Sequence, residues 1–353
     1  MDNITKSILK FIIKSLAVVL PVIAIAIMWY VVTDPFKVVR HYNCYLPDPI
    51  ETPVRVGINK GLITLTNFND RLSEGYSYNA FIFGSSVSCY YDAVSWAHLA
   101  DSTGKAHPYH FDSSGESLMA MADKVEYLDR TGQPIDYAMI VLDPIVMSAN
   151  QKDGPSNINP PQLMSGLIEF LKYHYIYFRA STNADFFKSW IPAMLTGKPC
   201  NNGHNIVFEP QPIVYDPLIN QESLPLWDSI ISANPVQFYS RYPLVPSPDS
   251  ITINDVILTT DKVEALHRIE RVFTRHNTDY HIIIGPNRRK VVINPIDLDT
   301  IINCFSAPNR IHDFSLSKAH ILESDTLLYD NTHYRSTLAL WLMQEVYRKS
   351  NIR

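Results

Sequence analysis

The sequence predicts an α/β fold with a parallel sheet, preceded by one helix that spans a membrane. The sheet is indicated by three apolar runs, residues 80–83, 137–142 and 280–284, that show no polar alternation. Segments with helical periodicity separate these runs, and buried strands that alternate with helices are typical of a parallel sheet covered on both faces. The membrane helix is indicated by residues 15–32, which include no charged side chain.

The N-terminal segment predicts a membrane anchor. We expect a cytoplasmic tail over residues 1–11 and a transmembrane helix over residues 12–32, long enough to cross about 30 Å of hydrocarbon. Three lysines, Lys6, Lys10 and Lys14, precede the uncharged core, so the positive-inside rule places the N-terminus in the cytoplasm. The sequence thus predicts a single-pass protein of the cytoplasmic (inner) membrane, with a C-terminal domain that is periplasmic or otherwise extracytoplasmic.

Two other interpretations of this segment stay open. A cleaved signal peptide has a shorter apolar core and a small-residue cleavage site, whereas this run ends in Met28, Trp29 and Tyr30. A buried core helix is the second alternative, although a segment that is apolar on all faces and follows three lysines favours the membrane.

The exported part begins with a proline-punctuated connector, expected over residues 33–78 as extended chain with short strands. A domain follows over residues 79–353, in which the strands named above alternate with helices expected at 91–101, 118–129, 260–277 and 336–349. An insertion interrupts this pattern at about residues 150–251. It has helices expected at 161–179 and 182–195, and then a loop-rich, proline-rich stretch over 200–248.

The composition supports a folded protein and argues against several function classes. Hydrophobic residues make up 46% of the 353 positions, so the chain can bury a large core. The net charge is −5 and neither half has a long basic run, which argues against binding to nucleic acid. The cysteines lack a C-x-x-C pair, and export allows them up to two disulfides in any of three pairings: Cys44, Cys89, Cys200 and Cys304.

Serines gather directly after the first core strand. The segment FIFGSSVS places Ser85, Ser86 and Ser88 at the carboxyl end of that strand, where open α/β sheets bind their ligands. A serine at the start of the following helix has backbone N–H groups nearby that can stabilise an oxyanion. The plainer interpretation is that these serines cap the helix.

A partner for a nucleophilic serine lies near the C-terminus. The sequence Asp330-Asn331-Thr332-His333 precedes the last expected helix. A histidine at this place can act as a general base on a serine, with Asp330 orienting its ring. An Asp-x-x-His pair alone is not specific, but its position before the last helix, combined with Ser86 after the first strand, gives it weight.

Together these motifs resemble the SGNH hydrolase superfamily. The matching blocks are FIFGSSVS, HFDSSGES with Gly115, DFS at residues 313–315 and YDNTHYR from Tyr329. The resemblance covers residues 79–149 and 279–349, and it points to membrane-anchored members that act in envelope O-acylation, such as those of lipoteichoic-acid D-alanylation and alginate O-acetylation. It implies a flavodoxin-like, three-layer α/β/α fold with a parallel sheet, a helical and loop insertion, and one N-terminal transmembrane helix.

The resemblance also implies roles for individual residues. Ser86 corresponds to the acyl nucleophile, His333 to the general base and Asp330 to the residue that orients the base. The backbone N–H groups of Ser86 and Gly115 correspond to the donors that stabilise the oxyanion.

The sequence departs from the family pattern at two places, Ser85 and Asp143, which are therefore possible accessory residues. Ser85 stands in a Gly-Ser-Ser block where the family usually has Gly-Asp-Ser. Asp143 follows the second strand at the place of an asparagine that helps to bind the oxyanion. Because an aspartate repels an oxyanion, we expect that another group substitutes for it, that turnover is slow, or that the site is inactive.

Four other features have plainer interpretations than a chemical role. His107 and His110 lack the carboxylates of a metal site, so a solvated loop or a supporting role is favoured. Cys89 is expected to be a buried thiol, and the basic cluster 287–290 a solvated turn. The aromatic residues of 173–178 fit a sugar-binding face and a core helix equally well.

The sequence therefore predicts a membrane-anchored serine acyltransferase or esterase that acts on acyl esters of a cell-envelope polysaccharide, acetyl being the expected group. The resemblance implies a partner, a multi-spanning membrane-bound O-acyltransferase, and the proposed chemistry needs no metal or organic cofactor. The alternative is a non-catalytic SGNH-like subunit that binds glycan or serves as the scaffold of an O-acylation complex.

Overall fold

The computed structural model describes residues 3–46, 55–150, 154–164, 166–198, 207–208, 212–315 and 324–350, and it confirms an α/β fold with a parallel sheet. The chain divides into two units. Met1–Ile58 and Gly166–Pro210 form the first, which we call the anchor unit, and Asn59–Ser165 and Gln211–Arg353 form the second, which we call the sheet unit. Cys200 lies outside the described residues.

The sheet has five parallel strands in the order β11-β9-β4-β2-β3. Their bounds are β2 Ala80–Gly84, β3 Pro108–His110, β4 Tyr137–Leu142, β9 Asp279–Ile284 and β11 Ile311–Asp313. Numbered along the chain, the strands therefore run 2-1-3-4-5, which is the order of flavodoxin-like sheets. Strand β3 lies on one side of β2, whereas β4 and the later strands lie on the other, so the order reverses between β2 and β4. Ligands of such sheets bind at this point, outside the carboxyl ends of the strands.

Alternate strand residues build two separate cores, one on each face of the sheet. Phe81, Ile140 and Ile282 point into the larger core, whereas Ile82 and Met139 point into the smaller one. Each of these side chains is at most 1% exposed. Both faces of the sheet are therefore covered, as the unbroken apolar runs predict.

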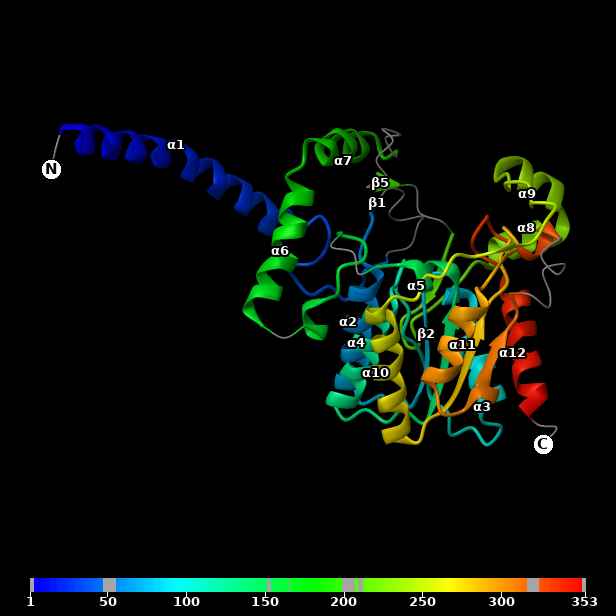
Figure 1. Cartoon of the computed structure of the whole chain (residues 1–353). Coiled ribbons are helices and arrows are strands. Elements are labelled where there is room, and N and C mark those ends of the chain that lie inside the picture. Colours follow the sequence, from blue (N-terminus) through cyan, green and yellow to red (C-terminus); the bar gives the residue numbers. More distant parts are fainter. Residues whose placement is uncertain are drawn as a thin grey trace. The chain divides into compact units, whose positions relative to one another are not determined.

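The helices form the outer layers of the sheet unit (Figure 1). The larger core is covered by α2 Lys60–Ser73, α4 Leu118–Arg130, α10 Thr260–His276 and α11 Pro295–Cys304, and the smaller core by α3 Ala93–Ala100 and α12 Ser336–Ser350. Of these, α3, α4, α10 and α12 agree with the predicted helices within one or two residues at most ends. Short elements near the sheet are η1 Ser88–Tyr90, α5 Pro144–Ser148, η2 Pro161–Leu163, η3 Pro308–Arg310, η5 Asp325–Leu327, and the parallel pair β8 Thr252–Ile253 and β10 Val291–Val292.

The expectation of an extended connector over residues 33–78 is wrong for its second half. Residues Lys60–Ser73 form α2, which begins at the N-cap Asn59, whose side chain accepts a hydrogen bond from the backbone N–H of Leu62. Leu65 and Phe68 of this helix are fully buried in the larger core. The connector therefore contributes a layer of the sheet unit.

The expectation of a loop-rich stretch over residues 200–248 is also wrong for its described part beyond residue 212. β6 Val214–Asp216 and β7 Gln221–Ser223 form an antiparallel hairpin. Two helices follow, α8 Pro225–Ala233 and α9 Pro235–Arg241, and each has proline at its first position, where the missing N–H is not needed. The prolines thus start helices here instead of interrupting them.

The anchor unit is built around the N-terminal helix α1, Asn3–Thr33. Residues Ser7–Thr33 are long and apolar enough to cross a membrane, with mean hydropathy 2.6. None of the residues in the most apolar stretch of this segment is buried by the rest of the protein. The helix already begins at Asn3, so the expected boundary between a tail and the span at residue 12 is not a break in secondary structure. Residues 166–210 of the insertion belong to this unit, whereas its flanking residues 150–165 and 211–251 belong to the sheet unit.

Two helices of the insertion contact the C-terminal end of α1. They are α6 Leu167–Ser181 and α7 Ala184–Thr196, and α7 is capped by Asn183 instead of the expected Thr182. In the anchor unit, the short antiparallel pair β1 Arg55–Val56 and β5 Val207–Phe208 is also described. Tyr173 and Tyr177 are buried and Tyr175 is exposed, so α6 is a core helix on the face that carries Tyr173 and Tyr177.

Candidate active site

The turn after β2 presents one serine and buries the others. From Phe81 to Tyr91 every residue is buried except Ser86, which is half-buried. Gly84 is required at the end of the strand because a Cβ there would lie 2.7 Å from the Cβ of Ser88 and 3.2 Å from the carbonyl oxygen of Val141. The close fit of this turn leaves the Ser86 hydroxyl as its accessible chemical group.

The structure brings Ser86, His333 and Asp330 together in one chain of hydrogen bonds. The Oγ of Ser86 lies 2.9 Å from Nε2 of His333, and Nδ1 of His333 lies 2.8 Å from Oδ2 of Asp330. When the neutral ring donates from Nδ1 to the carboxylate, Nε2 is unprotonated and can accept the serine proton. This is the arrangement of a nucleophile, a general base and an orienting carboxylate.

The loop that carries Asp330 also holds its carboxylate in place. Oδ1 of Asp330 accepts hydrogen bonds from the backbone N–H of Thr332 at 2.7 Å and from that of His333 at 2.8 Å. Burial by itself raises the pKa of Asp330, but the bonds and charge of His333 and the backbone bonds outweigh it and lower the pKa below its ordinary value. The carboxylate therefore stays ionised and keeps the histidine ring oriented.

The backbone of the neighbouring strand brings Gly115 toward the same edge of the sheet. The pairing of β3 with β2 continues past the strand, because the N–H of Ser113 donates to the carbonyl oxygen of Gly84 at 3.2 Å. Two residues later Gly115 has φ +59°, a left-handed conformation that favours glycine. Within the described residues, the backbone N–H groups of Ser86 and Gly115 make no hydrogen bond, so both stay available as donors.

Next to Gly115 lies a buried ion pair. Glu116 is 2% exposed and its Oε1 lies 2.6 Å from Nζ of Lys124, which also donates to the carbonyl oxygens of Phe111 and Asp112. Burial raises the pKa of Glu116 to about 7, although Lys124 opposes the shift. The protonation state of Glu116 is therefore sensitive to pH near neutrality.

Asp143 contacts the turn after β2 through Ser85. It is 4% exposed, its Oδ2 accepts a hydrogen bond from Oγ of Ser85 at 2.6 Å, and its Oδ1 accepts one from the backbone N–H of Val146 at 3.1 Å. Both accessory candidates thus form one buried contact that joins the loops after β2 and β4. Both carboxylate oxygens of Asp143 accept hydrogen bonds. Its negative charge, which is expected to repel an oxyanion, is therefore partly compensated.

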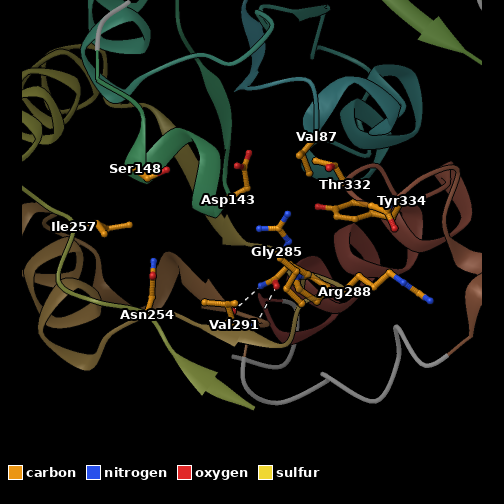
Figure 2. A pocket seen from close by; sticks show the side chains of 14 residues that line it. Val87, Asp143, Ser148, Asn254, Ile257, Gly285, Arg288, Val291, Thr332 and Tyr334 are labelled. Carbon is orange, nitrogen blue, oxygen red and sulfur yellow. Dashed lines mark hydrogen bonds between the residues drawn. The ribbon is translucent and has the colours of Figure 1, made fainter. Parts of the chain in front are cut away.

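A cleft of about 340 Å³ lies beside these residues (Figure 2). Val87 and Thr332, the chain neighbours of Ser86 and His333, line it together with Asp143 and Tyr334. Much of the remaining lining is polar: Ser148, Asn254, Asn287, Arg288, Arg289 and Asn331. The volume lies in the range of small-ligand sites.

The basic cluster 287–290 is not a simple solvated turn. Arg288 is 8% exposed, pairs with Asp325 at 2.5 Å and donates from Nε to the carbonyl oxygen of Val245 at 2.8 Å. Arg289 is exposed and lines the cleft. The cluster therefore supplies one structural and one accessible cation.

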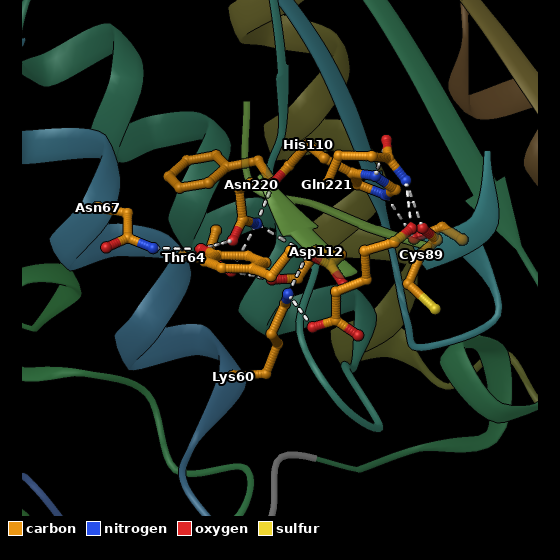
Figure 3. A network of polar contacts seen from close by, with 12 residues as sticks. Lys60, Thr64, Asn67, Cys89, His110, Asp112, Asn220 and Gln221 are labelled. Carbon is orange, nitrogen blue, oxygen red and sulfur yellow. Dashed lines mark hydrogen bonds and ion pairs between the residues drawn. The ribbon is translucent and has the colours of Figure 1, made fainter. Parts of the chain in front are cut away.

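Residues of the insertion support the turn after β2, and no sequence motif predicts this support (Figure 3). Ser88 donates from Oγ to the carbonyl oxygen of Ser85 at 2.7 Å and lies 3.2 Å from Nε2 of His110. Gln221 of β7 lies against the same ring at 3.4 Å and donates to the carbonyl oxygen of Cys89 at 2.7 Å. His110 is therefore fully buried and supports this turn, and burial lowers its pKa. It does not belong to a solvated loop.

A buried cation extends this network to α2. Lys60 is 7% exposed, forms an ion pair with Glu222 of β7 and lies 4.0 Å from Asp112. Asn220 donates to Thr64 at 3.0 Å and to Asp112 at 3.1 Å. No local signal could have shown this network, because its members lie on segments far apart in the sequence.

The remaining candidates have structural roles. Cys89 and Cys304 are buried free thiols, and burial raises the pKa of both. Cys44 is free and exposed, so the structure has no disulfide among these three cysteines. In the described part of the chain, no group of three or more His, Cys, Asp or Glu side chains is placed to hold a metal ion.

No protein-family model matches the sequence, and a search of the curated proteins gives no match either. The resemblance to the SGNH superfamily therefore rests on the motifs and on their order along the chain.

Proposed function

We propose that this protein is a membrane-anchored serine acyltransferase or esterase of the SGNH type that acts on acyl esters of a cell-envelope polysaccharide. The observation that carries the proposal is the hydrogen-bond chain from Ser86 through His333 to Asp330. It lies after strand β2, at the point of the sheet where such folds bind ligands, and a cleft opens beside it. A structural cap would need neither the histidine nor the carboxylate.

The proposed cycle uses groups of this chain alone. Oγ of Ser86 attacks the acyl carbonyl carbon while Nε2 of His333 takes the hydroxyl proton, and the N–H groups of Ser86 and Gly115 stabilise the oxyanion. The ester C–O bond then breaks, and His333 returns its proton to the leaving alcohol. In the second half, His333 deprotonates a sugar hydroxyl or water, which attacks the acyl-serine. The bond between the acyl carbon and Oγ then breaks, and His333 returns the proton to Oγ of Ser86.

The lining of the cleft supports a carbohydrate substrate. Amide groups of Asn254, Asn287 and Asn331 and the guanidinium of Arg289 can donate hydrogen bonds to sugar oxygens. We propose acetyl as the acyl group, because the resembling envelope proteins include those of alginate O-acetylation.

The anchor and the partner belong to the same proposal. The apolar surface of α1 supports a single pass through the cytoplasmic (inner) membrane, and the lysines at its start favour a cytoplasmic N-terminus. The sheet unit then works outside the cytoplasm, where activated acyl donors have to be delivered. We propose a multi-spanning membrane-bound O-acyltransferase as the partner that delivers the acyl group.

The proposal is tested by fluorophosphonate labelling of the full-length protein in detergent micelles, read by intact mass. Wild type should gain one adduct, and Ser86→Ala and His333→Ala should each lose it. Ser148→Ala is the matched control, because Ser148 is exposed in the same cleft and should leave labelling unchanged.

Two outcomes would contradict the catalytic function. If folded wild type gains no adduct, the serine is not activated, and the second candidate, a non-catalytic glycan-binding or scaffold subunit, is favoured. Asp143, at the place of the family's asparagine, is the observation in favour of that candidate. If Ser86→Ala still labels, the reactive serine lies elsewhere.

A further inference from the structure

Helices α6 and α7 of the anchor unit each carry a stripe of exposed apolar side chains. On α6, Leu167, Leu171 and Tyr175 follow one another at intervals of four residues and are 71%, 56% and 56% exposed. On α7, Met194 and Leu195 are 61% and 81% exposed. We call the whole set the apolar collar: Leu167, Ile168, Leu171, Tyr175, Ile191, Met194 and Leu195. Contiguous apolar surface of this kind marks an interaction site.

The stripe on α6 lies next to the contacts that α6 makes with α1. His174 and Phe178 are three and seven residues after Leu171, so they share its side of the helix. The hydroxyl of Tyr30 in α1 lies 2.7 Å from Nδ1 of His174, and the rings of Tyr30 and Phe178 lie 6.0 Å apart.

The stripe on α7 has the same relation to α1. Phe187 is four residues before Ile191 and lies on the same side of α7. Its ring is 5.3 Å from that of Trp29 in α1. The collar therefore continues the exposed apolar surface of α1 at the C-terminal end of that helix, on both helices that contact it.

The position of these contacts along α1 indicates what covers the collar. Trp29 and Tyr30 lie close to the end of the apolar stretch Ser7–Thr33. Tryptophan and tyrosine are enriched at this level of a membrane helix, where hydrocarbon meets the headgroups. Helices that contact α1 at Trp29 and Tyr30 are therefore held at the membrane surface if α1 spans the membrane.

The charges of the two helices agree with a lipid surface. Four basic and two acidic residues lie between positions 166 and 198: Lys172, Arg179, Lys188, Lys198, Glu169 and Asp185. An amphipathic helix with apolar and basic faces is typical of segments that lie in the interface of membranes with anionic lipids. The occupant favoured by this charge and by the continuity with α1 is lipid.

We propose that α6 and α7 lie in the outer interface of the membrane, with the apolar collar inserted among the lipid headgroups. This inference rests on the proposed membrane span of α1. It makes the anchor unit a platform on the membrane surface as well as a tether.

The test uses the full-length protein in vesicles of phosphatidylethanolamine and phosphatidylglycerol. Cys44 and Cys200 are replaced by serine, and an environment-sensitive fluorophore is attached to a single new cysteine at Leu171→Cys or Ile191→Cys. Lipids with a nitroxide on the acyl chain serve as quenchers. Glu169→Cys, two residues before Leu171 and therefore on another side of α6, is the matched control, and Val22→Cys in α1 reports the membrane span itself.

The collar positions should show blue-shifted emission that the nitroxide lipids quench, while the label at position 169 stays in a polar environment and is quenched weakly. Quenching at position 22 but not at 171 and 191 overturns the inference and leaves the anchor intact. Blue-shifted collar labels that lipids do not quench would show that protein covers the collar, which also overturns it. No quenching at position 22 would contradict the anchor itself and, with it, this inference.

Discussion

The contact between Ser85 and Asp143 predicts a measurable coupling between the loop that carries Ser86 and the loop after β4. Ser85 is fully buried and Asp143 is 4% exposed, so water cannot easily replace the hydroxyl in Ser85→Ala. The substitution removes the donor that lies 2.6 Å from Oδ2 of the carboxylate and leaves the N–H of Val146 as its remaining partner among the contacts described above.

The size of the effect follows from the charge of the acceptor. A hydrogen bond to a charged group contributes about 1.5–3 kcal/mol, and a neutral one about 1 kcal/mol. We therefore expect Ser85→Ala to lower the free energy of unfolding by about 2 kcal/mol. In the Asp143→Asn background the same change should cost only about 1 kcal/mol, which leaves a coupling of about 1 kcal/mol.

The assay is thermal unfolding of the four proteins of this cycle, full-length and in the same detergent. Ser85→Ala should lower the melting temperature by about 4–8 °C, since 1 kcal/mol corresponds to about 2–4 °C in a domain of this size. Ser148→Ala, at an exposed position of the neighbouring helix α5, should change it little. Equal losses from Ser85→Ala in both backgrounds would refute the coupling, because the carboxylate would then not be what the hydroxyl stabilises.

Three further predictions concern the charged groups of the sheet unit. Asp330→Asn should slow fluorophosphonate labelling by about 10⁴-fold, measured as a rate constant, because the ring loses the partner that fixes its tautomer. Lys60→Met leaves Glu222, whose side chain is only 13% exposed, without its cation and should cost about 3 kcal/mol in unfolding experiments. Because the folded-state pKa of Glu116 is raised to about 7, the stability that its proton supplies is present at low pH and lost as pH rises through about 7. Between pH 5 and pH 8, the free energy of unfolding of Glu116→Gln should therefore fall less than that of wild type.

Local patterns sufficed where one segment carries its own signal. The strands β2, β4 and β9 are predictable because each is apolar on both sides, which only a doubly covered sheet requires. The helix α10 is predictable because Leu266, Ile269 and Val272 recur on one side. For the site, the position of Ser86 after the first strand and of His333 before the last helix was enough to predict that they meet, as the 2.9 Å contact shows.

Sequence patterns fail to predict an element whose buried side chains are polar. Helix α2 has Lys60, Thr64 and Asn67 at buried positions, so its apolar face is interrupted in the sequence. These positions make sense only with their partners, of which Glu222 follows Lys60 by 162 residues. The hairpin that brings those partners, β6 and β7, has no strand signal in the sequence for the same reason, since its strands are short and its inward side chains are polar.

The same distant contacts explain how a Gly-Ser-Ser turn can hold Ser86, the proposed nucleophile, in place. Oxyanion donors and a nucleophile contribute to catalysis only when they are held in place before the substrate arrives. Here Asp143, which follows β4, accepts a hydrogen bond from Ser85. Ser88, the first residue of η1, contacts the carbonyl oxygen of Ser85 and the ring of His110. Gln221 fixes the carbonyl of the next residue, Cys89, and is supplied by the insertion. The half-buried Ser86 is thus the one side chain of this turn that is left to react, and the insertion is part of its support as well as an addition to the fold.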